Sequence, residues 1–180
     1  MQTLFLASGC FWSKEYHLRQ LSGVLATQVG FAGGHTVNPT YVQVCQKDTG
    51  HAEVVAVTYD PTQLPTRALL TEFFTLHNFE MNRGRGTGQY RSAVFALDED
   101  AQLATARTMI AELRDAGYAP MTDVEAVMAF YPAEERHQQY CSVRGMRPKR
   151  KDDVEVRRAL GGGGSLKRQG KGGGTSGYAA

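Results

Sequence analysis

The chain has 180 residues, of which 42% are hydrophobic, and this is enough for one domain with a buried core. Residues 1–143 hold ten Lys or Arg against fifteen Asp or Glu, whereas residues 144–180 hold ten against three, so a mildly acidic domain precedes a basic tail. There is no charged and apolar leader and no apolar run of about eighteen residues, so we expect a soluble, cytoplasmic protein. The three cysteines are widely spaced without a CxxC pair, which argues against a disulfide framework and a zinc site.

Five apolar runs bounded by turn residues predict strands. They cover residues 4–7, 24–31, 53–59, 91–97 and 124–130. Helical spacing of apolar residues predicts four helices. These begin at Phe11, at Thr66, at Asp98 or Asp100 and at Pro132, and end near residues 21, 76, 116 and 140. The polar span 32–50 is long for a connection, and we expect it to line a site.

This order of elements predicts an α/β fold, a two-layer sandwich in which helices pack on a mixed sheet. The catalytic domain would cover residues 1–143. We predict that residues 144–180 form a disordered tail, because they are basic and, from residue 161, rich in glycine with little to bury. A basic tail could attract nucleic acid or an anionic surface, but a solvated extension is the simpler interpretation.

Cys10 lies between a predicted strand and a predicted helix, directly after the turn residues Ser8 and Gly9. This places its sulfur at a helix N-terminus, where free backbone N–H groups and the helix dipole favour a thiolate, the reactive form of cysteine. The alternative is that Cys10 is a small buried apolar residue, as free cysteines commonly are.

Four blocks resemble the A-type peptide methionine sulfoxide reductases. They are Gly9-Cys10-Phe11-Trp12, Pro39-Thr40-Tyr41-Val42-Gln43-Val44-Cys45, Thr49-Gly50-His51-Ala52-Glu53 and Gln89-Tyr90-Arg91-Ser92. The resemblance covers about residues 3 to 140 and does not extend into the last forty residues. It implies a ferredoxin-like β-α-β-β-α-β core and an enzyme that reduces the S epimer of methionine sulfoxide, free or in proteins, with a cysteine nucleophile. It also implies no metal or organic cofactor, a thioredoxin-like external reductant and a monomer.

The same resemblance implies catalytic roles for four residues. Cys10 would attack the sulfoxide sulfur, and Glu53, placed in an apolar strand that would keep it protonated, would supply a proton to the departing oxygen. Tyr41 and Tyr90 match two phenols that hydrogen-bond this oxygen. Each of these three could instead be an ordinary strand-end or half-buried residue.

An aromatic wall is implied beside the nucleophile. Phe11 and Trp12 match the wall that receives the substrate's methyl group, although a tryptophan in this place is otherwise most often part of a core. Cys45 and His51 lie within matching blocks, and we assign them structural roles, with Cys45 packed.

The chain departs from the family in the loop 78–89. This loop is shorter than in many relatives, and the family's loop aspartate has no clear counterpart, since Arg85 or Thr87 falls at its distance from Gln89. Ser13 follows Trp12 where glycine is usual. We interpret these differences as features of a subgroup.

The recycling of Cys10 is the least determined step. Arg150 stands where many relatives keep a resolving cysteine, and no cysteine follows Cys141. We predict that Cys141 is an inefficient resolving residue at best and that an external thiol attacks the Cys10 sulfenic acid directly. Two other functions stay open: an inert domain that binds nucleic acid or an anionic surface through its tail, and a hydrolase that uses Cys10 with a histidine base.

Overall fold

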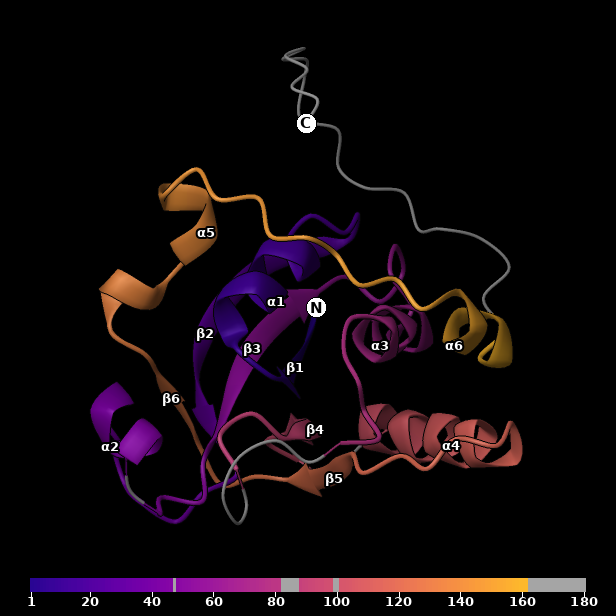
Figure 1. Cartoon of the computed structure of the whole chain (residues 1–180), viewed down its shortest axis with the longest axis horizontal. Helices are drawn as coiled ribbons and strands as arrows, with labels where there is room; N and C mark the ends of the chain where they lie inside the picture. The colour runs from indigo at the N-terminus through magenta and orange to yellow at the C-terminus, as the bar shows by residue number, and fades with distance from the viewer. Residues whose placement is uncertain (47, 82–87, 99–100, 162–180) are drawn as a thin grey trace.

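The computed structural model describes residues 1–46, 48–81, 88–98 and 101–161, and it is a mixed α/β fold around one six-stranded sheet (Figure 1). The strands are β1 (Gln2–Ser8), β2 (Val24–Ala32), β3 (Ala52–Tyr59), β4 (Ser92–Ala96), β5 (Asp123–Ala126) and β6 (Phe130–Pro132). The helices are α1 (Phe11–Leu18), α2 (Tyr41–Gln46), α3 (Thr66–Thr75), α4 (Ala101–Asp115), the 3₁₀ turn η1 (Glu135–His137), α5 (Tyr140–Val143) and α6 (Val154–Ala159).

The centre of the sheet comes from the first two thirds of the chain. The strand order is β5-β4-β1-β3-β2-β6, and every neighbouring pair from β4 to β6 is antiparallel. β5 pairs with β4 in parallel, so the predicted mixed sheet is confirmed. Within the predicted loop 32–50, residues 41–46 form the short helix α2, because local spacing over six residues is too brief to separate a helix from a turn.

Residues 124–130 form parts of two strands, so the prediction of a single strand is wrong. β5 lies at one edge of the sheet and β6 at the other, joined only by residues 127–129. A link of this length spans about 14 Å at most, whereas six flat strands would be about 24 Å wide. The sheet therefore curls until its edges approach one another, and Phe5 of β1 stacks on Phe130 of β6 with 5.0 Å between ring centroids.

Both faces of the curled sheet are buried. Leu4 and Leu6 of β1 face a core that is completed by the apolar sides of α1, α3 and α4. Phe5 and Ala7, which alternate with them, face a second and smaller core rich in alanine. Small side chains suit this inner face because a tightly curled sheet leaves little room inside it.

The prediction of a disordered tail from residue 144 is wrong for residues 144–161. Helix α6 packs against α3, and Val156 and Leu160 are 1% and 2% exposed. Asp153 caps α6, since its Oδ1 accepts a hydrogen bond from the backbone N–H of Val156 at 3.2 Å. The rest of the predicted tail, residues 162–180, lies outside the described residues.

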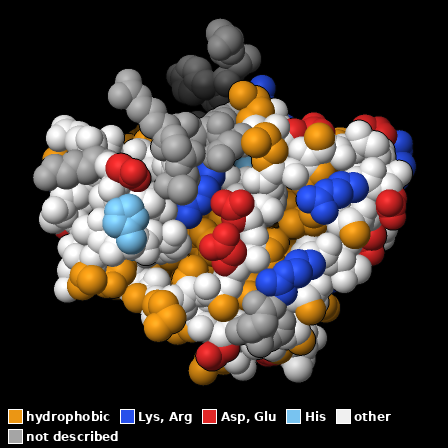
Figure 2. Space-filling model, turned by 90° about the horizontal axis from the view of Figure 1, so that it is seen from below, with side chains coloured by type: hydrophobic (Ala, Val, Ile, Leu, Met, Phe, Trp, Pro, Cys, Tyr) orange, Lys and Arg blue, Asp and Glu red, His pale blue; other side chains and the backbone are white. Residues whose placement is uncertain are grey.

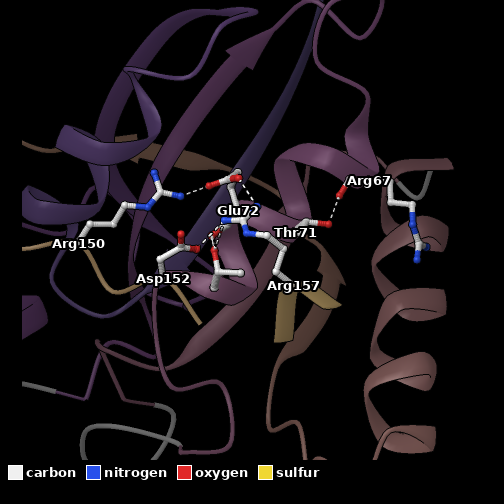
Figure 3. A network of polar contacts seen from close by, with 7 residues as sticks. Arg67, Thr71, Glu72, Arg150, Asp152 and Arg157 are labelled. Atoms are coloured by element: carbon white, nitrogen blue, oxygen red, sulfur yellow. Dashed lines mark hydrogen bonds and ion pairs between the residues drawn. The ribbon is translucent and has the colours of Figure 1, made fainter. Parts of the chain in front are cut away.

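A buried carboxylate explains why this segment docks (Figure 3). Glu72 of α3 has a side chain only 2% exposed, and it forms an ion pair with Arg150 and another with Arg157 at 2.7 Å. Arg157 also contacts Asp152 at 2.6 Å. The composition of the tail could not indicate this, because the partner in α3 lies 78 and 85 residues away in the sequence.

Helix lengths and polarity bear on a membrane location. Among the residues that the structure describes, no helix combines the length and the apolar character that crossing a bilayer requires.

Candidate active site

The site residues meet where three strand ends lie side by side. β1 ends at Ser8, which pairs with Ser92 at the beginning of β4. β3 is antiparallel to β1, so it begins at this same end of the sheet, with Glu53 as its second residue. Sequence-distant blocks around Cys10, Glu53 and Tyr90 are thereby brought together, as the motif blocks predicted.

Cys10 is the N-cap residue of α1, so its predicted place between a strand and a helix is confirmed. Gly9 has a φ of 92°, in the left-handed region that favours glycine, and this turns the chain sharply from β1 into the helix. Cys10 itself is partly exposed. A turn of this kind presents the sulfur at the end of the central strands, where a small substrate can reach it.

The predicted ionisation of Cys10 is wrong. Burial has the largest influence and raises the pKa of the thiol, and the charges of Glu53 and Cys141 raise this pKa further. Backbone hydrogen bonds from Trp12 and Ser13 lower the pKa, as a helix N-terminus should, but they do not reverse its direction. Cys10 therefore rests as a thiol, and its proton must leave when the sulfur attacks.

Glu53 is a buried carboxyl group held by neutral donors. It is 1% exposed, its Oε2 accepts a hydrogen bond from the backbone N–H of Phe11 at 3.2 Å, and its Oε1 accepts one from Nε2 of Gln89 at 3.4 Å. Within the described part of the chain no Lys, Arg or His forms an ion pair with it. Burial raises the pKa of Glu53 to about 7, so this carboxyl can hold a proton near neutral pH. Its hydrogen bond with Phe11, the residue after Cys10, keeps it close to the nucleophile.

Two phenols surround this acid. Tyr41 is the first residue of α2 and Tyr90 precedes β4, and both are half-buried. Burial raises the pKa of each phenol, and the nearby charge of Glu53 raises both further. The charge of Cys10 also raises the pKa of Tyr90. Both phenols therefore stay protonated and can donate hydrogen bonds.

Aromatic rings line the site beside Cys10. Phe11 is 1% exposed and lies 6.4 Å from Trp12 and 6.4 Å from Tyr41 between ring centroids. Trp12 is half-buried and stacks on Tyr140 of α5, with 3.8 Å between centroids and 8° between planes. Its indole Nε1 donates a hydrogen bond to Nδ1 of His137 at 3.3 Å. The rings thus form a continuous apolar wall, the surface that recognition of a methyl group requires.

The other two cysteines have different surroundings. Cys45 is exposed rather than packed as predicted, and its sulfur accepts a hydrogen bond from Nε2 of Gln89 at 3.4 Å. Cys141 of α5 is 3% exposed, yet its charge affects the pKa of Cys10. His51 is buried, its Nδ1 accepting from the backbone N–H of Gly34 at 3.2 Å, so it holds the loop before β3.

Several residues of the site went unpredicted. Gln89 lies inside a recognised block, but its contact with Glu53 is visible only in three dimensions. Glu15 of α1 is 1% exposed and accepts hydrogen bonds from Thr27 Oγ1 at 3.0 Å and from the backbone N–H of Gln139 at 2.8 Å, so it fixes α5 against α1. His137, in the turn before α5, completes the wall through contacts more than one hundred residues away in sequence. No local pattern signals such contacts.

Two further expectations concern the loop 78–89 and the question of a metal site. Arg85 and Thr87, at the place of the missing aspartate, lie outside the described residues. Among the residues that are described, no group of three or more His, Cys, Asp or Glu side chains lies close enough to hold a metal ion.

Known proteins resemble this chain over most of its length. The sequence model of the family described as peptide methionine sulfoxide reductase matches residues 2–159, which extends past the predicted domain end and includes α6. A peptide methionine sulfoxide reductase MsrA of Erwinia tasmaniensis is 42% identical over 144 residues, covering 78% of this chain and 80% of that protein.

Solved structures are similar as well. Mxr1 from Saccharomyces cerevisiae in reduced form matches with a TM-score of 0.72 and 32% identity, over 82% of this chain and 88% of that one. Mxr1 in complex with Trx2 matches with a TM-score of 0.54 and 27% identity, over 77% of this chain and 84% of that one. With the shared fold and the family match over nearly all described residues, the chain belongs to the peptide methionine sulfoxide reductase family.

Proposed function

We propose that this protein reduces the S epimer of methionine sulfoxide, free or within proteins, to methionine. The observation that carries this proposal is Glu53, which is buried, has no cationic partner among the described residues and has a pKa raised to about 7 next to the Cys10 turn. Breaking an S–O bond needs a nucleophile on sulfur and a proton on oxygen, and this pair supplies both. We also propose that β4-β1-β3-β2 with α1 and α3 is a ferredoxin-like core.

The chemistry would run as a two-electron exchange between two sulfur atoms. Cys10 loses its proton and its sulfur attacks the sulfoxide sulfur, while Glu53 delivers a proton to the oxygen, which Tyr41 and Tyr90 stabilise by hydrogen bonds. The hydroxyl then moves from the substrate sulfur to the Cys10 sulfur: the substrate S–O bond and the transient S–S bond break, a new S–O bond forms on Cys10, and methionine leaves beside a Cys10 sulfenic acid. The cysteine sulfur is oxidised by two electrons as the sulfoxide is reduced by two, and the proton lost by the thiol returns Glu53 to its acid form. Phe11 and Trp12 would receive the substrate's methyl group.

A thioredoxin-like protein is the reductant that we propose, on the analogy of Mxr1 with Trx2. Cys141 is buried, whereas Cys10 is partly exposed, which favours direct attack of an external thiol on the Cys10 sulfenic acid. That attack forms a mixed disulfide and releases water, and a second thiol then restores Cys10. Mass spectrometry after one equivalent of methionine sulfoxide without reductant tests this step, since a quantitative Cys10–Cys141 disulfide would overturn it.

The activity itself is tested with purified protein and dithiothreitol. We expect reduction of the S epimer alone. Chromatographic separation of methionine from each sulfoxide epimer measures the reaction. Reduction of the R epimer, or of neither, would contradict the proposal.

Binding of nucleic acid through a free basic tail is not favoured. Arg150 and Arg157 are held by Glu72, and Arg158 pairs with Glu155 at 3.0 Å, so three of the tail's cations are already paired. On the face shown in Figure 2, Lys and Arg side chains are interspersed with Asp and Glu rather than gathered in one basic patch.

A further inference from the structure

A three-layer stack leads from the aromatic wall to the surface. Trp12 lies 3.8 Å from the Tyr140 ring, and the guanidinium of Arg144 lies over the Tyr140 ring at 3.7 Å from its centroid. Tyr140 is half-buried and Arg144 is exposed. A cation on a ring face is attracted by the ring's quadrupole, so this contact holds the guanidinium close to the wall rather than leaving it free in solvent.

The protein holds this stack from both sides. The backbone N–H of Gln139 binds Glu15 in α1 at 2.8 Å, which fixes the beginning of α5. After α5, the chain is held by the ion pair between Arg150 and Glu72. The position of Arg144 is therefore restrained at both ends of the segment that carries it.

The guanidinium of Arg144 has charge and donors to offer. Among the described residues no carboxylate lies within 4.0 Å of it, and no hydrogen bond from its side chain is formed to them. Its charge reaches the site: burial is the main cause that lowers the pKa of His137, and the charges of Arg136 and Arg144 lower it further, against an opposing effect of Glu134. His137 bonds the indole of Trp12, so this rim of the site is positive toward a substrate.

We propose that Arg144 is a specificity residue that binds a carboxylate of the substrate next to the methionine sulfoxide, an inference that rests on the proposed function. When the substrate's methyl group contacts Trp12, the guanidinium of Arg144 lies two stacking distances away, beyond Tyr140. The substrate's main chain advances about 3.3–3.6 Å per residue, so a group next to the methionine sulfoxide can reach this guanidinium. The carboxylate could be the α-carboxylate of a free or C-terminal methionine sulfoxide, or the side chain of a neighbouring Asp or Glu. A planar guanidinium binds either one with two parallel hydrogen bonds.

The experiment compares two S-sulfoxide peptides that differ only in Asp or Asn after the methionine sulfoxide, using Arg144→Gln and dithiothreitol. We expect KM for the Asp peptide to rise about fivefold with kcat little changed, and KM for the Asn peptide to stay the same. Free methionine sulfoxide and its amide form the second arm, which shows whether the α-carboxylate is also bound. Arg158→Gln is the matched control, because it removes the same charge from exposed α6 and should change neither KM.

An equal rise in KM for both peptides would overturn the inference, because it would mean that Arg144 only supports Tyr140. No change with the Asp peptide and with free methionine sulfoxide would overturn it too. Trp12 is the one tryptophan of the chain, so unchanged fluorescence in Arg144→Gln shows that the stack remains. Arg144→Lys should recover part of the Asp preference, and salt should weaken that preference in the wild type. Failure of the proposed function is seen separately, as absence of wild-type turnover with the Asn peptide.

Discussion

Two regions of this protein each bury a glutamate, and they treat it in opposite ways. Glu53, at the end of the sheet, and Glu72, in α3, are both 1% exposed. Glu72 is paired with Arg150 and Arg157, whereas within the described ranges Glu53 accepts hydrogen bonds from neutral donors, the Phe11 backbone and Gln89. Both environments satisfy the carboxyl oxygens, but only one provides compensating charge.

The difference separates a structural carboxylate from a chemical one. Glu72 forms ion pairs with two guanidinium groups, so it serves to hold the segment that carries α6. Without such a partner, burial raises the pKa of Glu53 to about 7, and its proton can be exchanged under ordinary conditions. Burial by itself does not mark a catalytic acid. Burial without a cation, beside a nucleophile, does so far better.

The largest effect should come from the nucleophile that distinguishes the two regions. We expect Cys10→Ser to abolish turnover, because a hydroxyl is a poor nucleophile toward sulfur. Cys45→Ser, which alters an exposed thiol at the rim, is the control and should remain active. Methionine formation with dithiothreitol is the measurement, and appreciable activity in Cys10→Ser would place the nucleophile elsewhere.

Removing the charge of Glu72 should cost stability rather than chemistry. Glu72→Gln removes the buried carboxylate between Arg150 and Arg157 and leaves Arg157 with the partly exposed Asp152, so we expect the free energy of unfolding to fall by roughly 3 kcal/mol. Glu155→Gln breaks the ion pair with Arg158, in which the Arg158 side chain is 72% exposed and the Glu155 side chain 69% exposed. This change should cost less than about 1 kcal/mol. Urea unfolding measures both, and equal losses in the two variants would refute the contrast.

Glu53→Gln should lower activity without lowering stability. We expect kcat/KM to fall about 10²-fold or more, since the amide has the same shape but no proton to give. Stability should be unchanged below about pH 4, where Glu53 is neutral in both the folded and the unfolded protein. Above pH 7 the variant should be more stable than the wild type, by an amount on the order of 3 kcal/mol, because a carboxyl whose folded pKa is raised loses stability as pH rises from its unfolded pKa to its folded one. Loss of stability without loss of rate would make Glu53 a structural residue.

The pH dependence of the wild type provides the finest test. The reactive form has Cys10 deprotonated and Glu53 protonated, so the two groups together hold one proton. At low pH they hold two, and kcat/KM should therefore rise with pH until the pair has lost one proton, which happens at about pH 7, where Glu53 titrates. It should fall again only above the ordinary cysteine range, because the pKa of Cys10 is raised. In Glu53→Gln the rise of kcat/KM up to about pH 7 should disappear. If the rise persists in this variant, a group other than Glu53 causes it.

What the sequence determined by itself was local. Apolar runs bounded by turn residues predicted the strands near residues 4–7, 24–31 and 53–59, and the motif blocks identified Cys10 and Glu53 as candidates. The tertiary structure alone decided the ionisation of Cys10, the two edges to which residues 124–130 contribute, and the docking of residues 144–161. The physical reason is the same in each case: burial, sheet closure and buried ion pairs depend on groups that meet only after folding, whereas periodicity and capping depend on neighbours in the chain.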